Sequence, residues 1–346
     1  MNVLHVLGNI SGTTIPVEIA SATDRLPDTN VSLVSKDPLP QELPDTVEND
    51  QVLTDLCGFD DFSTLLHDVG KRYDIVHTHT VAEAAKVGYH AIRQPIHHVN
   101  TQHGHLHYTR EEKVKNIPGL LLADTIIYNS QCTSRSYNLI EKALKSRANE
   151  YVVHNGVNID AIQSSPTPTS TSQTVVTATR LIKRKNLGTL IRAIAHTDNI
   201  SLRIIGDGPY KSELQQMTRK AGVESRVEFL GYLPDRQDVY AEIANGDVFA
   251  LPSHGEGFCV AVTEGMAVGL PVVVSDIPIF HEVVGDAGVF VDRTDPVSIA
   301  NALRELLENP QKAQTIGEQN RTRIREEFTL EDCARGYRDV YRAELS

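Results

Sequence analysis

The sequence predicts an α/β protein built from two parallel sheets, and three observations lead to this fold class. Short β-branched runs alternate with helical patterns along the whole chain, which is typical of βαβ units. This alternation occurs twice, once on each side of a polar segment. The length of 346 residues suggests two compact domains, each large enough to bury a core of its own.

Short apolar runs mark the expected strands. In the first half of the chain they are Val3–Leu7, Val31–Val34, Ile75–His77, Ile96–Asn100, Thr125–Tyr128 and Tyr151–Val153. In the second half they are Val175–Ala178, Leu202–Ile205, Val227–Leu230, Val248–Leu251, Val272–Val274 and Val289–Val291. Helices fit between them. The clearest has apolar residues at i, i+3, i+4 and i+7, the spacing of a helix packed on a sheet: Leu187, Leu190, Ile191 and Ile194.

A run of Ser, Thr and Pro at residues 161–174 is predicted to be the linker between two domains, because it is too polar to join a core. The predicted N-terminal domain covers residues 1–160, and the predicted C-terminal domain covers residues 175–329. The alternative, a long loop inside one larger domain, is disfavoured by the independent strand and helix series on both sides. The segment 330–346 carries apolar residues at helical spacing, so one face of a helix is expected to dock there.

Composition excludes several classes of protein. The chain has 45 acidic and 33 basic residues and a formal charge of −12, so it is not built to coat nucleic acid. Its 4 cysteines are widely separated and form no CxxC pair, which argues against a disulfide framework and a structural zinc site and favours a reducing cytoplasm. No signal peptide is recognisable, and Met266–Phe280, the most apolar stretch, is interrupted by polar residues and prolines, so no membrane span is expected.

Ligands of open parallel sheets bind at the carboxyl ends of the strands, so the strand-to-helix junctions are the candidate sites. The most distinctive junction follows Val248–Leu251. Gly255 and Gly257 allow the backbone to approach a ligand closely, and Glu256 lies between them. Glu264 is expected in the second turn of the short helix that follows. The two carboxylates are therefore expected to reach one ligand at different points.

A basic segment follows the first strand of the second half. Arg180 and Lys185 lie between this strand and a helix, where a guanidinium, an ammonium group and helix N–H groups suit a diphosphate. The alternative is a solvated basic loop, since Lys183 and Arg184 lie in the same segment. A further glycine-rich turn, GDGP at Gly206–Pro209, is weaker evidence, because such a turn needs glycine with or without a ligand.

These motifs, in this order, resemble the retaining glycosyltransferases of family 4. The resemblance rests on RLxxxK at Arg180–Lys185, GDGP at Gly206–Pro209, FLGYL at Phe229–Leu233, and the E-x7-E pattern from Glu256 to Glu264 followed by AxGLPVV. It is strong after Arg180. Before Arg180 it is moderate and is carried by YDIVHTHT, VNTQHG, YNSQCT and VVHNGVN.

The resemblance implies a GT-B fold, in which two Rossmann-like domains face a central cleft. A nucleotide-sugar donor, UDP- or GDP-linked, would bind the C-terminal domain, and a saccharide or lipid-linked acceptor would bind the N-terminal one. The last helix, 330–346, would pack back on the first domain. The implied enzyme is a retaining hexosyltransferase that needs no metal or other cofactor. It would serve surface polysaccharide or glycolipid synthesis in the cytoplasm, with peripheral contact at the inner face of the membrane left open.

The site residues of the family carry over position by position. Arg180 and Lys185 resemble the pair that neutralises the donor diphosphate, and Glu256 resembles the glutamate that contacts the donor sugar. His103, in NTQHG, resembles the histidine near the anomeric centre and the acceptor. The remaining implied donor contacts are Glu264 on the ribose hydroxyls, the backbone of Gly257, Phe258 and Cys259, and the glycines Gly206 and Gly12. The family's paired glycines after the first strand are here separated, as Gly8 and Gly12.

Sugar transfer from a nucleotide diphosphate develops negative charge on the departing phosphate, which Arg180 and Lys185 would stabilise. Retention in such enzymes is explained by attack on the face that the leaving group vacates. A transient covalent intermediate on Glu256 is the alternative. Two other functions stay open: a GT-B nucleotide-sugar epimerase and a non-catalytic nucleotide-sugar-binding subunit. A nicotinamide dehydrogenase is disfavoured, because no GxGxxG follows the first strand.

Histidines cluster in the first half of the chain. His103, His105 and His107 alternate, so in a strand they would share one face and could hold a metal ion. No carboxylate or cysteine lies at ligand spacing nearby, so hydrogen-bonded histidines are expected and no metal is expected. Cys259, inside the E-x7-E pattern, is expected to be a small buried apolar side chain and not a nucleophile.

Overall fold

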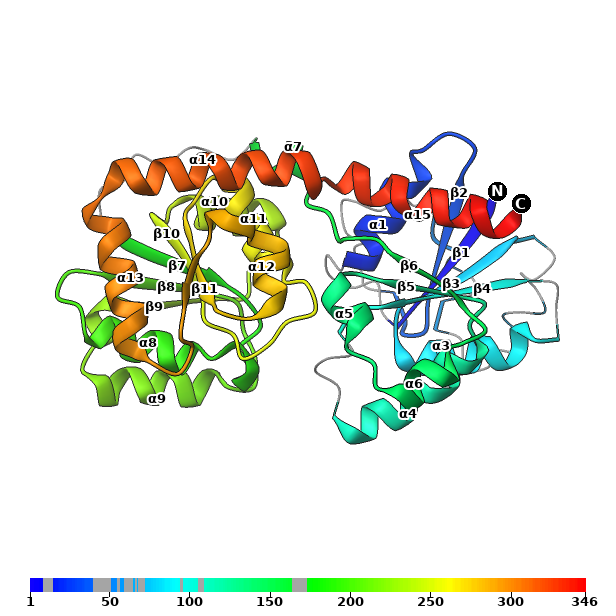
Figure 1. Ribbon diagram of the computed structural model, residues 1–346, viewed down its shortest axis with the longest axis horizontal. Helices are drawn as coiled ribbons and strands as arrows, with labels where there is room; N and C mark the ends of the chain where they lie inside the picture. Colours follow the sequence, from blue (N-terminus) through cyan, green and yellow to red (C-terminus); the bar gives the residue numbers. More distant parts are fainter. Residues whose placement is uncertain are drawn as a thin grey trace. The chain divides into compact units, whose positions relative to one another are not determined.

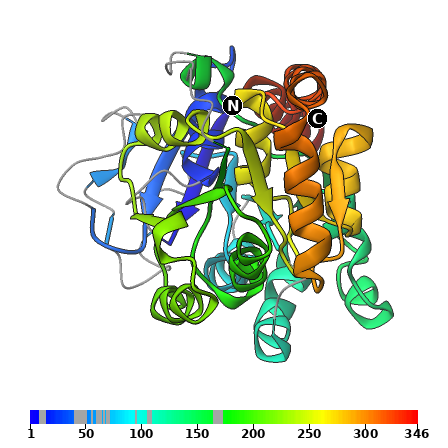
Figure 2. The same ribbon diagram turned by 90° about the vertical axis from the view of Figure 1, so that its left-hand side faces the viewer.

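The computed structural model describes residues 1–8, 15–39, 51–54, 57–58, 65, 67, 72–93, 96–104, 109–163 and 173–346. The chain divides into two compact units. Unit 1 comprises Met1–Gly156 together with Leu330–Ser346, and unit 2 comprises Val157–Thr329. Each unit holds one parallel sheet of six strands (Figures 1 and 2).

The sheet of unit 1 has the strand order β2-β1-β3-β4-β5-β6. Its strands are β1 (Asn2–Leu7), β2 (Asn30–Ser35), β3 (Ile75–Thr78), β4 (His97–Gln102), β5 (Thr125–Tyr128) and β6 (Asn149–Val152). Its described helices are α1 (Ile15–Asp24), α3 (Val81–Ala91), α4 (Arg110–Leu122), α5 (Gln131–Arg135), α6 (Leu139–Leu144) and α15 (Leu330–Leu345).

Helices cover both faces of this sheet because alternate strand residues point to opposite sides. Val3 and Leu7 of β1 join the core that also holds Tyr337 of α15, where α15 packs against α1. Leu4 and Val6 join the opposite core, which includes Val87 of α3. On that second side α4 packs against both α3 and α6 (Figure 1).

The sheet of unit 2 has the order β12-β11-β10-β7-β8-β9, which is the Rossmann arrangement. Its strands are β7 (Thr174–Ala178), β8 (Ser201–Ile205), β9 (Val227–Gly231), β10 (Val248–Leu251), β11 (Val272–Ser275) and β12 (Val289–Val291). Its described helices are α7 (Ile159–Gln163), α8 (Leu187–Ala195), α9 (Lys211–Ala221), α10 (Arg236–Ala244), α11 (Val260–Val268), α12 (Pro278–Val284), α13 (Pro296–Glu308) and α14 (Pro310–Glu327), with short 3-10 turns at Lys183–Lys185, Glu224–Arg226 and Gly285–Ala287.

Every predicted strand forms, with its ends displaced by no more than two residues. The predicted helical face is also present, since Leu187, Leu190, Ile191 and Ile194 of α8 are all buried. Local signals explain where several helices begin and end. The side chain of Asp295 caps α13 before Pro296, and Gly222 ends α9 with a φ of 69°.

The division of the chain differs from the predicted domain boundary. Most of the predicted linker, residues 164–172, lies outside the described residues. The chain changes unit at Val157, before that segment, because α7 packs against α10 and α11 of unit 2. At the other end α15 belongs to unit 1, where its apolar face is buried: Cys333, Tyr337, Val340 and Tyr341. The predicted cleft between the domains stays a prediction.

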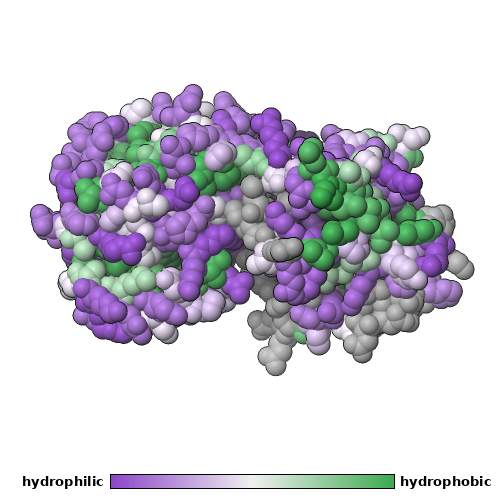
Figure 3. Space-filling view, turned by 60° about the horizontal axis from the view of Figure 1, so that its bottom comes forward, coloured by the Kyte–Doolittle hydropathy of each residue, from purple (hydrophilic) through white to green (hydrophobic). Residues whose placement is uncertain are grey.

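The surface of unit 1 carries exposed apolar side chains on α3, α4 and α6 or at their ends. Leu139 and Ile140 of α6 are 85% and 73% exposed, and the others are Tyr89, Ile92, Val114 and Leu121. Figure 3 shows an extended hydrophobic area on this unit. Among the described residues, no helix combines the length and the apolar character that a membrane crossing requires.

Candidate functional site

The strand order of unit 2 reverses between β7 and β10, and ligands of Rossmann sheets bind at the carboxyl ends of such a pair. The loop after β7 carries the basic segment, and the loop after β10 carries Glu256. Asn186, which follows the basic segment after β7, donates hydrogen bonds to two other loops. Its side chain bonds to the carbonyl of Pro252 after β10 (2.9 Å) and to the carbonyl of Arg293 after β12 (2.8 Å). The backbone N–H of His254 donates to the carbonyl of Arg184 at 2.8 Å. The two loops are therefore held side by side.

Glu256 is the centre of this site. Its side chain is almost fully buried, and three groups donate to its carboxylate: Lys185 Nζ to Oε1 (2.8 Å), Ser253 Oγ to Oε1 (2.6 Å) and Arg184 to Oε2 (3.1 Å). Burial by itself would raise the pKa of Glu256. The two cations and the Ser253 hydroxyl outweigh burial and hold the pKa below its usual value. Glu256 is therefore ionised at neutral pH.

The structure brings together Lys185 and Glu256, both predicted as site residues. Lys185 and Arg180 were predicted to neutralise a donor diphosphate together, and that role stays a prediction. Arg184 is the cation that shares the carboxylate with Lys185, and it also donates to the carbonyl of Gly255 at 2.8 Å. Arg180 is exposed, and the described part of the chain gives it no ion pair. A buried glutamate needs a cationic partner, so the run of cations at residues 183–185 could have indicated that Arg184 as well as Lys185 pairs with Glu256.

Glu264 lies in the second turn of α11, as predicted, and is also buried. Its Oε1 accepts a hydrogen bond from the guanidinium of Arg236, the first residue of α10. Arg236 was not predicted, because no spacing rule connects α10 with α11. The two glutamates of the E-x7-E pattern are thus each neutralised by different cations.

The other predicted donor contacts in unit 2 lie in the same loops. Phe258 is buried, and its ring lies edge-on to the ring of Phe328 with the centroids 5.6 Å apart, so its side chain is part of the packing of unit 2. Cys259 occupies the N-cap position of α11 with a φ of 78°, and its side chain makes no capping hydrogen bond. Burial raises the pKa of its thiol to about 12, so the thiol stays protonated at neutral pH and behaves as a small apolar side chain. Gly257 precedes these two residues.

Gly206 follows β8 with a φ of 120°, and a Cβ there would lie 2.1 Å from the carbonyl oxygen of Thr179. Glycine is therefore required for the turn after β8 to pack on the loop after β7. The packing of this turn explains why position 206 is a glycine. The predicted contact of Gly206 with the donor stays a prediction. Gly12 lies outside the described residues, as do His105 and His107.

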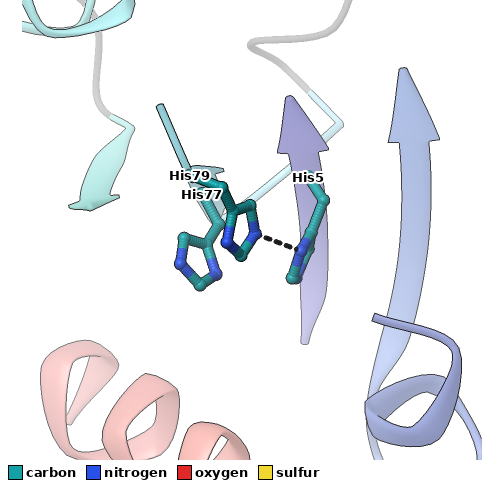
Figure 4. Close-up of side chains that lie close together, drawn as sticks. All are labelled: His5, His77 and His79. Atoms are coloured by element: carbon teal, nitrogen blue, oxygen red, sulfur yellow. Dashed lines mark hydrogen bonds between the residues drawn. The ribbon is translucent and has the colours of Figure 1, made fainter. Parts of the chain in front are cut away.

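His103 follows β4 in unit 1 and belongs to a cluster of histidines near the carboxyl ends of β1, β3 and β4. His5 lies on β1 beside His77 of β3, with the two paired in register, and His79 follows β3. His5 Nδ1 lies 2.9 Å from His79 Nε2 (Figure 4). His79 Nδ1 lies 3.2 Å from His103 Nε2. The sequence analysis expected hydrogen-bonded histidines but missed His5, because sequence order does not show that β1 and β3 are neighbours.

His5, His77 and His79 each place a ring nitrogen within 4.8 Å of the others, a spacing that deserves comparison with a metal centre. Both nitrogens of His5 and His79 are already hydrogen-bonded within the cluster or to Tyr341. Those of His77 are bonded to Tyr341 and Thr101. A metal ion would have to break several of these bonds. Burial lowers the pKa of His5 to about 3 and lowers the pKa of His77 and His79 well below the usual value, so the rings are neutral.

Comparison with known proteins places unit 2 in a family. Residues 158–323 match the sequence profile of the glycosyl transferases group 1. The chain is 30% identical over 172 residues to the lipopolysaccharide core biosynthesis glycosyltransferase LpsD of Rhizobium meliloti (strain 1021), covering 48% of each chain. It is 35% identical over 156 residues to the GDP-mannose-dependent alpha-(1-6)-phosphatidylinositol monomannoside mannosyltransferase of Mycolicibacterium smegmatis, covering 41% of each. These alignments span less than half of the relatives' length.

Similarity to solved structures extends over both units. The crystal structure of Anabaena Alr3699/HepE in complex with UDP matches with a TM-score of 0.79 and 20% identity, covering 99% of this chain and 100% of HepE. HepE has also been solved in complex with UDP-glucose. Together with the two parallel six-stranded sheets, this similarity identifies the GT-B fold. Residues 158–323, nearly all of unit 2, therefore match the glycosyl transferases group 1 family, and the chain as a whole has the GT-B fold.

Proposed function

We propose that this protein is a retaining, metal-independent glycosyltransferase of family 4. It moves a sugar from a nucleotide-diphosphate donor bound by unit 2 to a saccharide or lipid-linked hydroxyl acceptor bound by unit 1. The observation that carries the proposal is the cluster of Lys185, Arg184 and Glu256 at the carboxyl ends of β7 and β10. This is the place where Rossmann sheets bind their ligands.

The charge of the cluster fits a diphosphate. The segment after β7 carries four cations, Arg180, Lys183, Arg184 and Lys185, and Glu256 offsets one of them. Lys185 and Arg184 act electrostatically on Cys259 at the N-terminus of α11, whose dipole also favours an anion. Such an arrangement would stabilise the negative charge that develops on the departing phosphate, which is the main task in this reaction. No metal ion is needed for that role.

Glu256 is better suited to an electrostatic role than to nucleophilic attack. Three donors already occupy its carboxylate, and its lowered pKa reflects how strongly they stabilise the charge. An oxygen held in this way is a weak nucleophile. This supports retention by attack on the face that the leaving group vacates, with a phosphate oxygen taking the acceptor proton. Glu256 would then hold Lys185 and Arg184 in position against the donor.

The relatives suggest the class of acceptor. One is named for lipopolysaccharide core biosynthesis and another for mannosylation of a phosphatidylinositol monomannoside. We extend this to a role in polysaccharide or glycolipid synthesis at the inner face of the membrane. The exposed apolar residues of α3, α4 and α6 support a peripheral contact with lipid. UDP- and GDP-sugars both stay candidates, because HepE was solved with UDP and the mannosyltransferase is GDP-mannose-dependent.

The test is product analysis with a panel of UDP-, GDP- and ADP-sugars, with and without saccharide and glycolipid acceptors. Acceptor-dependent release of nucleoside diphosphate, with the anomeric configuration kept in the product, is the expected result. Conversion of the donor without an acceptor would instead show an epimerase. Donor binding with no product would show a non-catalytic subunit. Full activity after exhaustive chelation is expected as well.

Variants then test the donor residues. Glu264→Ala is expected to weaken nucleotide binding, and unchanged binding would contradict its contact with the ribose. Replacing Arg180 and Lys185 together with Gln should lower kcat/KM by about 100-fold or more, because transition-state charge is left unbalanced. Lys312→Gln is the matched control, since it removes an exposed cation of unit 2 that pairs with Glu305 on the surface. A double variant as active as this control would rule out the diphosphate assignment.

A further inference from the structure

A continuous chain of hydrogen bonds connects α15 with His103 inside unit 1. It has seven members, and no other hydrogen bond is described for the side chains that link them. The links are Tyr337 OH to Thr101 Oγ1 (3.3 Å), Thr101 Oγ1 to His77 Nε2 (2.8 Å), His77 Nδ1 to Tyr341 OH (2.5 Å), Tyr341 OH to His5 Nε2 (3.2 Å), His5 Nδ1 to His79 Nε2 (2.9 Å) and His79 Nδ1 to His103 Nε2 (3.2 Å).

Each member of this chain brings one proton. A hydroxyl has one O–H, and a neutral imidazole has one N–H and one lone pair. The four rings are neutral, because burial lowers the pKa of each. Each internal ring must therefore donate to one neighbour and accept from the other, whereas a hydroxyl can also accept from both neighbours. Four arrangements satisfy all six links: every member donates toward His103, or the members donate toward the hydroxyl of Tyr337, Thr101 or Tyr341, whose own proton is then left over.

The four arrangements differ in which proton is left over. In three of them it is the hydroxyl proton of Tyr337, Thr101 or Tyr341. All three side chains are buried, and within the described residues their hydroxyls contact no hydrogen-bonding group outside the chain of hydrogen bonds. An unpaired buried donor is destabilising. When every member donates toward His103, the leftover proton is on Nδ1 of His103, which is partly exposed and can meet solvent or a ligand.

We propose that this chain fixes His103 as the Nδ1–H tautomer, so that His103 donates a hydrogen bond to a ligand oxygen and does not act as a base through Nδ1. Tyr341, His5 and His79 are then positioning residues, which act on the ligand only through His103. The identity of the ligand, an oxygen of the donor sugar or of the acceptor, rests on the proposed function. The tautomer does not, because it follows from contacts within unit 1.

The tautomers can be measured without a substrate. The whole protein is labelled with ¹⁵N-histidine, and long-range ¹H–¹⁵N spectra show which nitrogen of each ring carries the proton. The chain has 14 histidines, so their signals can be assigned by single His→Gln variants. His5, His77, His79 and His103 are all expected as Nδ1–H tautomers, whereas free histidine prefers Nε2–H. A proton on Nε2 of His103 in the unmodified protein would overturn the proposal, whether or not any variant folds.

Tyr341→Phe tests whether the chain transmits the tautomer. This substitution keeps the shape of a fully buried side chain and removes the link between His77 and His5. Whichever way His5, His79 and His103 then donate, Nε2 of His5 has lost its partner. His103 is therefore expected to become a mixture of tautomers, although Tyr341 does not touch it. Tyr137→Phe is the matched control: it removes a buried hydroxyl of unit 1 that donates to Gln102 outside the chain, and all four rings should stay Nδ1–H. A pure Nδ1–H His103 in Tyr341→Phe would contradict the proposal.

The same spectra separate this inference from the proposed function. If the tautomers are as expected but no sugar transfer is found, the proposed function fails and the chain of hydrogen bonds stands. If transfer is found but His103 carries its proton on Nε2, the inference fails and the function stands.

Discussion

Single residues in the two units show two solutions for buried ionisable groups. In unit 2 the buried Glu256 stays charged, because two cations and a hydroxyl compensate for its lost hydration. In unit 1 the buried histidines form no ion pair within the cluster that the described residues make, so they stay neutral and their ring nitrogens form hydrogen bonds with one another. The cations around Glu256 suit an anionic ligand. The neutral histidines suit a site in which a proton must stay on a defined nitrogen.

The neutral histidines predict that unit 1 is sensitive to acid. Burial lowers the pKa of His5 to about 3 and that of His98 to about 4, and it lowers those of His77 and His79 well below the usual 6.5. Below pH 6.5 the unfolded chain binds more protons than the folded one, so stability falls as the pH falls. For one such histidine the loss between pH 7 and pH 5 is about 2 kcal/mol, and several contribute.

Hydrogen exchange at pH 7 and pH 5, corrected for intrinsic rates, checks this expectation unit by unit. Strands β1, β3 and β4 should lose protection at pH 5. Strands β7 and β10 should keep theirs, since the pKa of Glu256 lies below 4.5 and its ion pairs persist. Equal losses in both units, or no change in either, would contradict the prediction.

Sequence reasoning predicted candidate site residues from local signals and missed the partners that come from other loops. Glu256 and Glu264 were predicted because their spacing is a motif, and Lys185 because it follows a strand. Arg184 and Arg236 were missed as partners. Which cation reaches a buried carboxylate depends on how the loops pack, and that information is not in the spacing of the residues.

At the scale of elements, periodicity was enough to find the strands but not to order them. Buried parallel strands such as β7 and β10 are continuous apolar runs, which stand out from their surroundings. The alternation of strands and helices implies parallel pairing, yet it does not say that β1 lies beside β3 or β7 beside β10. The histidine cluster and the Glu256 site both depend on those neighbours, so they became visible only in the structure.

The turn after β8 supplies a prediction about how neighbouring elements fix the basic loop. Gly206→Ala would place a Cβ 2.1 Å from the carbonyl oxygen of Thr179, and backbone on both sides prevents an easy adjustment. The substitution should lower the free energy of unfolding by more than about 3 kcal/mol and should weaken nucleotide binding, because the loop that carries Lys185 must move.

Gly222→Ala is the matched control for Gly206→Ala. Gly222 also has a positive φ, 69°, but a Cβ there meets no atom within 4 Å. It should therefore cost only about 1–2 kcal/mol, the ordinary price of a left-handed conformation for a residue other than glycine. Equal losses of stability for the two variants, measured by denaturant unfolding, would show that the contact with Thr179 is unimportant.

At the scale of the whole molecule, the chain is not two consecutive domains, since unit 1 is completed by the C-terminal helix. Tyr337 and Tyr341 of α15 belong to the core of unit 1 and complete its hydrogen-bonded chain. Amphipathic spacing predicted a docking face for this helix, and the family resemblance predicted which domain receives it. The spacing alone could not, because an apolar stripe does not specify its partner.

The exposed apolar residues of unit 1 lead to a prediction for the protein as a whole. If they contact lipid, the protein should sediment with vesicles of phosphatidylglycerol and phosphatidylcholine, more strongly at low salt because exposed cations such as Lys142 lie on the same helices. Leu139→Ser with Ile140→Ser should reduce binding by about 10-fold or more, since burying two large side chains in lipid is worth several kcal/mol. Val297→Ser, at an apolar residue of unit 2 that is 45% exposed, is the control and should bind normally. Equal binding by the α6 variant and this control would place the membrane contact elsewhere.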